Sequence, residues 1–247
     1  MKIILCMPVL QGNGSKFTAT NLAHYTKTLY PSKRVALVDF DTNTPYLAER
    51  LAIQDTTHSI DNLTDIIDGN YLDFSLFEQN MIVLKSGVQL LKGTKMVGAK
   101  QLINKTHIEA IISLLKENYD YVFISVSNEV SPGTVYGLFN ADEILLITRN
   151  NYPNYAHIER VLKLINNYKN NDSKIRLVIN QYSDLSEVSF NTVTKKYNIE
   201  DTELIPYIPE SFDHNDLDKG LISGNFFKSK NKAQEPFEIL INKIINN

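Results

Sequence analysis

A polar loop near the N-terminus has the residue types and spacing of a phosphate-binding turn. It spans residues 11–16, follows the apolar run of residues 2–7, and precedes helical spacing that begins at Thr18. Such a loop turns main-chain N–H groups inward at the positive end of a helix, and Gly12 and Gly14 let the backbone approach an anion without Cβ atoms in the way. A nucleotide phosphate suits this arrangement. The alternative is an ordinary strand-to-helix turn that binds nothing.

Two carboxylates stand at the end of the next apolar run, which covers residues 34–40. They are Asp39, within the run, and Asp41, directly after it. The segment 42–45, with the sequence TNTP, predicts a turn that redirects the backbone. Both carboxylates can then serve a site beside the loop, or they can simply cap that turn.

Length and composition indicate an ordinary globular protein. The chain has 247 residues, enough for one large α/β domain over residues 1–247 with a buried core. A hydrophobic fraction of 43% and a charged fraction of 21% argue against disorder. The formal net charge of −3 gives no strong nucleic-acid signal, although a local basic patch stays compatible with it.

The sequence favours a cytoplasmic location without a membrane span. The single cysteine, Cys6, cannot form an intramolecular disulfide, fits a reducing compartment and is expected to be buried. The N-terminal run is broken by Pro8 and lacks a cleavage site, so it is not expected to be a signal peptide. No run approaches the ~20 apolar residues of a transmembrane helix. The five histidines are scattered, so we expect no histidine metal site.

Apolar runs alternate with segments of helical spacing along the chain. This order predicts an α/β fold with a mostly parallel, doubly wound sheet flanked by helices. Ligands of such sheets bind at the carboxyl ends of the strands, which here are the loops 11–17, 39–43, 125–129 and 180–183. The expected strands are 2–7, 34–40, 81–84, 88–91, 121–126, 144–148, 175–180 and 202–207. The main expected helices are 18–29, 106–116, 154–168, 188–197 and 237–245, and a further helix with Ser59 or Asp61 as its cap is expected within 55–70.

Taken in order, these segments resemble the MinD/ParA family of deviant Walker P-loop ATPases. The resemblance runs along nearly the whole chain and is carried by GNGSKFTATNLA, RVALVDFDTNTPYLAERL, YDYVFISVSNEV, ADEILLITRNN, IRLVINQYSD and ELIPYIPES. It implies a P-loop NTPase-like fold, ATP or ADP as ligand, magnesium as a companion ion, and a homodimer.

The first loop departs from the family pattern K-G-G-x-G-K-S/T, and two registers are open. If Lys16 is the phosphate lysine, Ser15 replaces the preceding glycine, Phe17 replaces the magnesium-binding hydroxyl residue, and Gln11 replaces the signature lysine.

The second register holds the helical segment in line without a gap, and we prefer it. Gly12 and Gly14 then fall on family glycines, Ser15 on the phosphate lysine, Lys16 on the hydroxyl residue, and Leu10 on the signature lysine. The signature lysine is absent in either register.

A further departure is Ser125, which stands where the family has an aspartate at the end of the strand. Magnesium is normally held with help from a carboxylate, and a serine supplies no charge. Phosphoryl transfer depends on positioning and charge neutralisation, so these losses predict weak hydrolysis or none. Phosphate binding depends less on them, because main-chain N–H groups carry much of it.

The resemblance implies roles for individual residues. Asp41 would orient the attacking water if the protein is active, Asp39 would lie near a metal ion, and Ser125 is a weaker metal candidate. Asn180 would read the adenine edge, with a turn former as its alternative, and Lys16 would neutralise phosphate, with a solvated lysine as its alternative. The nucleotide contacts so implied are Gly12, Asn13, Gly14, Ser15, Lys16, Phe17, Thr18, Asn180 and Pro206.

Three functions follow from these features. The first is a degenerate MinD/ParA-like nucleotide-binding protein that dimerises and acts in positioning or partitioning, with weak or no ATP hydrolysis. The second is an active ATPase switch for plasmid or chromosome partitioning or for placing a septum or secretion machine. The third is a nucleotide-free scaffold. The sequence does not identify the cargo, although Phe226 and Phe227 are candidates for a partner contact.

Overall fold

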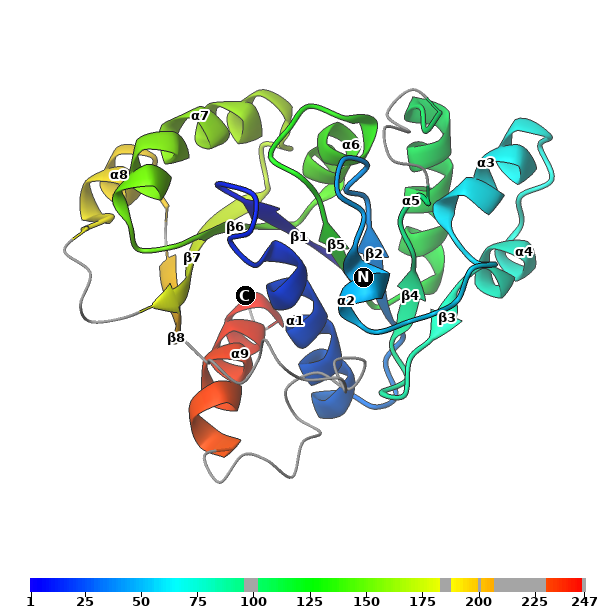
Figure 1. The fold of residues 1–247 in the computed structure, drawn as a ribbon, viewed down its shortest axis with the longest axis horizontal. Coiled ribbons are helices and arrows are strands. Elements are labelled where there is room, and N and C mark those ends of the chain that lie inside the picture. Colours follow the sequence, from blue (N-terminus) through cyan, green and yellow to red (C-terminus); the bar gives the residue numbers. More distant parts are fainter. Residues whose placement is uncertain (96–101, 183–187, 200, 207–229, 246–247) are drawn as a thin grey trace.

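An eight-stranded, mostly parallel sheet forms the centre of the molecule, in the order β3-β4-β2-β5-β1-β6-β7-β8 (Figure 1). The computed structural model describes residues 1–95, 102–182, 188–199, 201–206 and 230–245. All the neighbouring strands pair in parallel except β3 and β4. The strands are β1 (Lys2–Pro8), β2 (Val35–Asp39), β3 (Ile82–Val83), β4 (Gln89–Leu91), β5 (Tyr121–Ser125), β6 (Glu143–Thr148), β7 (Lys174–Tyr182) and β8 (Asp201–Pro206).

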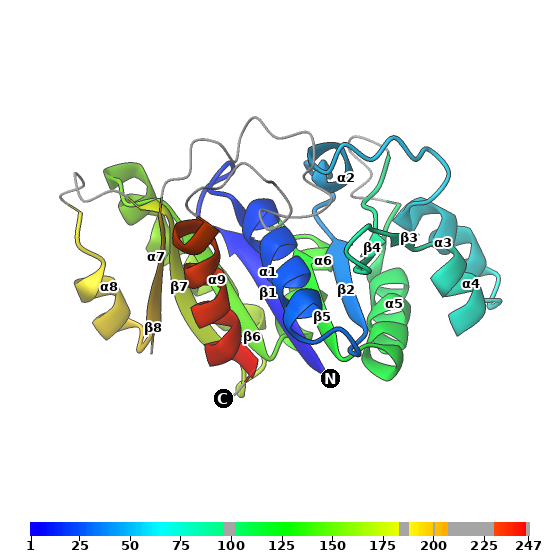
Figure 2. The same cartoon turned by 90° about the horizontal axis from the view of Figure 1, so that it is seen from below.

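Helices cover both faces of this sheet, which confirms the predicted doubly wound α/β fold (Figure 2). α1 and α9 pack on one face, and α3, α5, α6 and α7 pack on the other. The helices are α1 (Ser15–Leu29), α2 (Leu47–Arg50), α3 (Ile60–Asp68), α4 (Phe74–Gln79), α5 (Lys105–Asn118), α6 (Pro132–Asn140), α7 (Tyr152–Tyr168), α8 (Asn191–Lys196) and α9 (Lys230–Ile245).

The central strand β1 shows why its sequence is apolar throughout. Ile3, Leu5 and Met7 belong to the hydrophobic core on one face, whereas Ile4 and Cys6 belong to the core on the other. Successive side chains of a strand point to opposite faces, so a strand covered on both sides needs apolar residues at every position. Cys6 is fully buried as predicted, and burial raises the pKa of its thiol.

Helix α6 was missed by the sequence analysis, which predicted the loop 125–129 and no helix between that loop and the strand 144–148. Two glycines reduce its helical propensity, but they allow close packing. A Cβ atom on Gly133 would lie 2.5 Å from the Phe40 carbonyl oxygen, and one on Gly137 would lie 2.9 Å from Leu5. This contact between α6, β1 and the end of β2 is tertiary, so local pattern does not reveal it.

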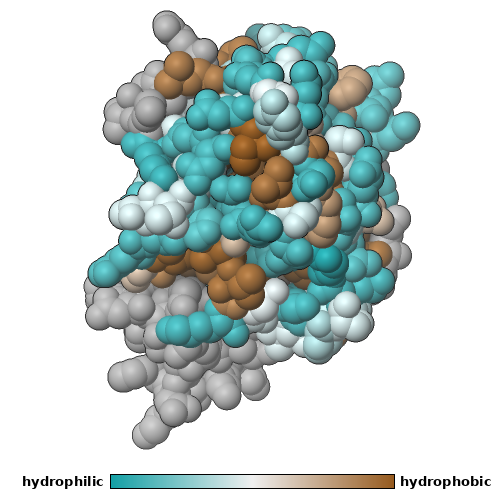
Figure 3. Space-filling model, turned by 90° about the vertical axis from the view of Figure 1, so that its right-hand side faces the viewer, coloured by the Kyte–Doolittle hydropathy of each residue, from teal (hydrophilic) through white to brown (hydrophobic). Residues whose placement is uncertain are grey.

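The face formed by α3, α4 and β3 is mainly hydrophilic, with separated hydrophobic areas (Figure 3). Tyr71, after α3, and Val83, in β3, are exposed hydrophobic residues of these segments. The edge strand β3 has only two residues, and short edge strands limit pairing with other chains. Among the described helices, none is long and apolar enough to cross a membrane.

Candidate functional site

The loop between β1 and α1 ends at a helix start that no side chain of the described residues caps. Gly12 and Gly14 have φ values of 84° and 95°, in the left-handed region that favours glycine. Gly14 is the N-cap residue of α1, and the first turn of the helix contains no acidic residue. The first N–H groups of a helix lack intrahelical acceptors and lie at the positive end of its dipole. This end of α1 is therefore suited to an anion.

Three side chains hold the loop in place, one each from β7, the segment after β6, and α7. Asn180, in β7, donates its Nδ2 hydrogen to the Asn13 carbonyl oxygen at 2.8 Å. Arg149, after β6, donates from Nη2 to the Gly12 carbonyl oxygen at 2.9 Å. The buried Asn13 side chain donates in turn to Asn154 of α7. The loop conformation is thus fixed by the protein itself.

Asn180 therefore contacts the loop directly. Its side chain is 2% exposed, and its Nδ2 atom lies 2.1 Å from where a Cβ atom on Gly14 would stand. The turn-forming alternative does not describe this residue, because its amide bonds a segment 167 residues away. Adenine recognition by Asn180 stays a prediction, and the donor that it needs is engaged with Asn13 in this structure.

Arg149 was missed by the sequence analysis, although the sequence holds a signal for it. It directly follows the buried strand β6, at the same carboxyl edge of the sheet as the loop. A charged side chain at that position of a parallel sheet lies within reach of a ligand site.

Lys16 lies between two buried carboxylates at the end of β2. Its Nζ atom is 2.7 Å from Asp41 Oδ2 and 3.7 Å from Asp39 Oδ1, and it lies 4.5 Å from the centre of the Tyr46 ring. Lys16 is only 3% exposed, so the alternative of a solvated lysine is wrong. The predicted turn after β2 does bring both carboxylates to one cation.

Main-chain and hydroxyl donors complete the shell of both carboxylates. Asp39 accepts hydrogen bonds from the N–H groups of Asp41 at 3.2 Å and Leu47 at 3.1 Å. Asp41 accepts from the N–H groups of Asn43 at 3.1 Å and Thr44 at 3.0 Å, and from the Thr44 hydroxyl at 2.8 Å. The carboxylates therefore cap the following turn and bind Lys16 at the same time.

Burial and the ion pair shift the pKa values of Asp39, Asp41 and Lys16 in different directions. Burial raises the pKa of Asp39 to about 6, although the charge of Lys16 partly opposes this. Burial also acts to raise the pKa of Asp41, but the charge and hydrogen bond of Lys16 and the donors of Thr44 outweigh it, so that this pKa lies below its usual value. Burial would lower the pKa of Lys16, yet both aspartates together raise it.

We expect Asp39 to take up a proton near pH 6, with a measurable effect on stability. Its pKa of about 6 in the folded state exceeds the usual 3.8, so between these values the folded protein binds the proton more strongly than the unfolded chain. The Asp39 contribution to the free energy of unfolding should therefore fall as the pH rises through about 6. Urea unfolding of the wild type and of Asp39→Asn across this range measures it. A difference between the two proteins that does not change with pH would contradict the assignment.

The other predicted ligand and partner contacts differ in where the structure places them. Phe17 is a core residue, with its ring 5.9 Å from that of Phe237 in α9, so only its main chain remains available to a ligand. Ser15 is the first residue of α1, and Thr18 is fully buried with no hydrogen-bond partner for Oγ1 among the described residues. Pro206 ends β8 at the carboxyl edge, while Phe226 and Phe227 lie outside the described residues.

A magnesium ion does not fit the residues present at the carboxylates. The Lys16 ammonium already lies between Asp39 and Asp41, and donors occupy their oxygens. Ser125 pairs in register with Asp39, and its buried Oγ has no hydrogen-bond partner in the described part of the chain, but the serine brings no charge. Within the described ranges, no group of three histidine, cysteine, aspartate or glutamate residues could hold a metal ion. The structure gives no support to the predicted metal roles of Asp39 and Ser125.

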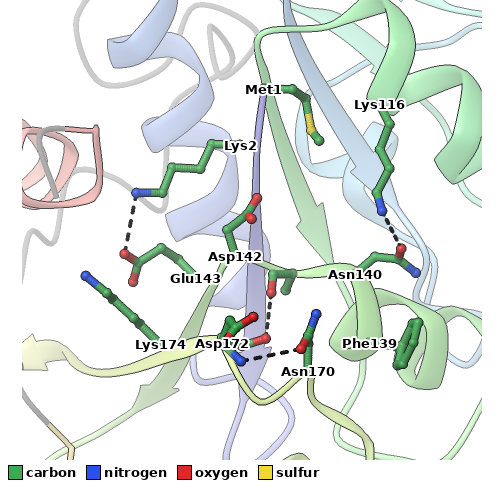
Figure 4. A pocket seen from close by; sticks show the side chains of 12 residues that line it. Met1, Lys2, Lys116, Phe139, Asn140, Asp142, Glu143, Asn170, Asp172 and Lys174 are labelled. Atoms are coloured by element: carbon green, nitrogen blue, oxygen red, sulfur yellow. Dashed lines mark hydrogen bonds and ion pairs between the residues drawn. The ribbon is translucent and has the colours of Figure 1, made fainter.

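A cavity of about 350 Å³ lies at the opposite end of the sheet, where β1, β6 and β7 begin (Figure 4). Several of its charged side chains already have partners. Lys2 lies 3.6 Å from Glu143, Lys116 donates to Asn140 at 2.7 Å, and Asp142 accepts from a main-chain N–H at 2.7 Å. Ligands of such sheets bind at the other edge, so this cavity is not the candidate site.

Comparisons with known proteins give a family match and several similar structures. The family described as an AAA domain matches residues 1–179. The septum site-determining protein MinD of Thermotoga maritima is 21% identical over 183 residues, which are 73% of this chain and 66% of that protein. The match thus covers slightly less than two thirds of the curated relative.

Two solved structures share the fold over nearly the whole chain. The ParA family ATPase from Chlorobium tepidum TLS has a TM-score of 0.82 at 17% identity, covering 97% of both chains. The septum site-determining protein MinD from Pyrococcus horikoshii OT3, complexed with Mg-ADP, has a TM-score of 0.76 at 16% identity, covering 99% of this chain and 96% of that one.

Proposed function

Because this chain belongs to the MinD/ParA-like family of P-loop ATPases, we propose that it is a nucleotide-binding positioning or partitioning protein with weak or no ATP hydrolysis. The observation that carries the proposal is the loop before α1, where two glycines in the left-handed region lead into an uncapped helix start. ATP or ADP is the ligand, as in the Mg-ADP complex of the MinD relative.

Nucleotide binding in this proposal relies on the main chain more than on side chains. The N–H groups at the start of α1 meet the phosphates, and Asn180 and Arg149 hold the loop in the shape that presents them. A preformed loop loses little conformational entropy when the ligand binds. The loss of the signature lysine therefore lowers affinity without removing the site.

Slow hydrolysis follows from what surrounds Asp41. A carboxylate that orients a water needs a free oxygen, but Asp41 is bound by Lys16 and by the donors of Asn43 and Thr44. Ser125 supplies no charge at the neighbouring strand end. Each preorganised group of this kind contributes about 10²–10³ in rate, so the loss of several predicts a very slow enzyme.

A homodimer is the expected working form, with a protein or DNA-bound cargo as its partner. Large hydrophobic side chains are exposed around the carboxyl edge of the sheet. Tyr46 before α2, Val130 after β5 and Tyr152 at the start of α7 are 42%, 60% and 73% exposed. Aromatic side chains such as those of the two tyrosines are enriched in the centres of protein interfaces. The names of the relatives, septum site-determining protein and ParA family ATPase, motivate a role in division or partitioning by analogy.

Calorimetric titration with ATP and ADP, together with light scattering and a turnover assay, tests the proposed function. We expect measurable binding, dimer formation with ATP, and turnover at least about 10²-fold below that of an active relative. Turnover at the rate of an active relative, abolished in Asp41→Ala, would instead support the ATPase switch. If neither nucleotide binds, the nucleotide-free scaffold is the better description.

A further inference from the structure

We propose that the Lys16 ammonium takes the place of the magnesium ion beside Asp39 and Asp41, so that the site works without a divalent cation. The part of this inference that concerns nucleotide rests on the proposed function, whereas the exclusion of the metal ion does not. Lys16 Nζ lies within 4 Å of one oxygen of each carboxylate, and its side chain is buried. The cation that balances these carboxylates is thus attached to the chain.

Electrostatic repulsion makes the two cations mutually exclusive. A Mg²⁺ ion binds carboxylate oxygens at about 2.0–2.1 Å. An ion on Asp41 Oδ2 would therefore approach the ammonium, which lies 2.7 Å from the same oxygen. A buried lysine cannot swing into water without leaving its contacts with Asp39 and Tyr46.

The donors around the carboxylates strengthen this exclusion. Magnesium requires near-octahedral geometry and keeps several waters. The N–H groups of Leu47, Asn43 and Thr44 already use oxygen lone pairs of the two aspartates. Room for the hydrated ion would require the turn after β2 to open. A bound phosphate must then be neutralised by the start of α1 and by nearby Arg149, because no metal ion accompanies it.

Direct manganese binding tests the exclusion, because Mn²⁺ replaces Mg²⁺ and its electron paramagnetic resonance signal reports binding without nucleotide. Three proteins are compared: the wild type, Lys16→Ser, and Lys33→Ser as a matched control. Lys33 is also a lysine paired with an aspartate, Asp120 at 2.9 Å, but its side chain is 47% exposed. We expect no specific Mn²⁺ binding to the wild type or to Lys33→Ser. In Lys16→Ser the affinity should rise at least about tenfold, and the added metal should raise the melting temperature.

Each outcome of the Mn²⁺ experiment either supports or overturns the exclusion of the metal ion by Lys16. Specific Mn²⁺ binding to the wild type, lost in Asp39→Asn, would overturn it. A Lys16→Ser protein that folds but gains no metal site would show that Lys16 is not what excludes the ion. If Lys16→Ser folds poorly, metal-dependent recovery of its folding supports the exclusion, and the wild-type measurement decides independently.

Nucleotide titration provides a second test, which asks whether nucleotide binding depends on Mg²⁺. ADP and ATP are titrated into the wild type with Mg²⁺ and, separately, with EDTA. We expect dissociation constants that agree within about twofold, whereas a metal-dependent site would lose roughly tenfold or more without the ion. Tenfold weaker binding in EDTA would overturn the metal-free site. An absence of nucleotide binding under both conditions would contradict the proposed function, and the Mn²⁺ results would still decide the exclusion.

Discussion

Replacing Gly14 with alanine is expected to lower the free energy of unfolding by about 2–5 kcal/mol and to abolish nucleotide binding. Gly14 has a φ of 95°, and an added Cβ atom would lie 2.1 Å from Asn180 Nδ2. The substitution therefore adds backbone strain and forces Asn180 out of its bond with the Asn13 carbonyl oxygen. Urea unfolding and calorimetric titration with ATP measure the two losses.

Gly12→Ala separates backbone strain from steric collision. Gly12 has a similar φ of 84°, but an added Cβ would have no heavy atom of the described residues within 4 Å. We expect this variant to lose only about 1–3 kcal/mol, the cost of the strained backbone alone. In the double variant Gly14→Ala with Asn180→Ala, the colliding amide is gone, so the loss should be smaller than the sum of the single losses. Equal losses in the free energy of unfolding for the two glycine variants, or strict additivity in the double variant, would contradict this explanation. Contact with Asn180 would then not be the reason that position 14 requires glycine.

Lys16→Met is expected to destabilise the protein by about 3–5 kcal/mol at neutral pH, because it leaves two buried carboxylates without their cation. Asp39 and Asp41 are 2% and 1% exposed, so water cannot replace the ammonium without opening the turn after β2. The loss should shrink as the pH falls, because protonation of the aspartates removes the uncompensated charge. Chemical unfolding at several pH values measures this trend.

Lys33→Met is the matched control, since its partner Asp120 is 37% exposed. Exposed ion pairs contribute little because water and salt screen them, so this variant should unfold close to the wild type. If Lys16→Met behaves like Lys33→Met, the buried ion pair does not stabilise the fold, and Lys16 is not needed as the cation of this site.

The two carboxylates illustrate how far local pattern predicts a site. An aspartate pair at the end of an apolar strand, followed by TNTP, predicts a turn, and that turn is present. The identity of the cation was not predictable in the same way. Lys16 and Asp41 are 25 residues apart, and they meet because α1 packs beside β2. The contact depends on how a helix lies on the sheet.

The loop between β1 and α1 shows the same difference between what the local sequence predicts and what tertiary contacts add. The sequence predicted a glycine turn between a strand and a helix, and both glycines have positive φ. The residues that hold it, Arg149 and Asn180, come from strands that are distant in the chain and neighbours in the sheet. The resemblance to the family pointed to Asn180, but to its role with adenine and not to its bond with Asn13.

The sequence alone determined the α/β fold, the order of its main strands and helices, and the position of the loop, because periodicity, apolar runs and glycines act over a few neighbouring residues. Only the tertiary structure decided that α6 packs through Gly133 and Gly137, that Asn180 lies against Gly14, and that Lys16 lies between Asp39 and Asp41. These features depend on side chains that meet across the sheet, and no local pattern encodes the direction in which a buried side chain finds its partner.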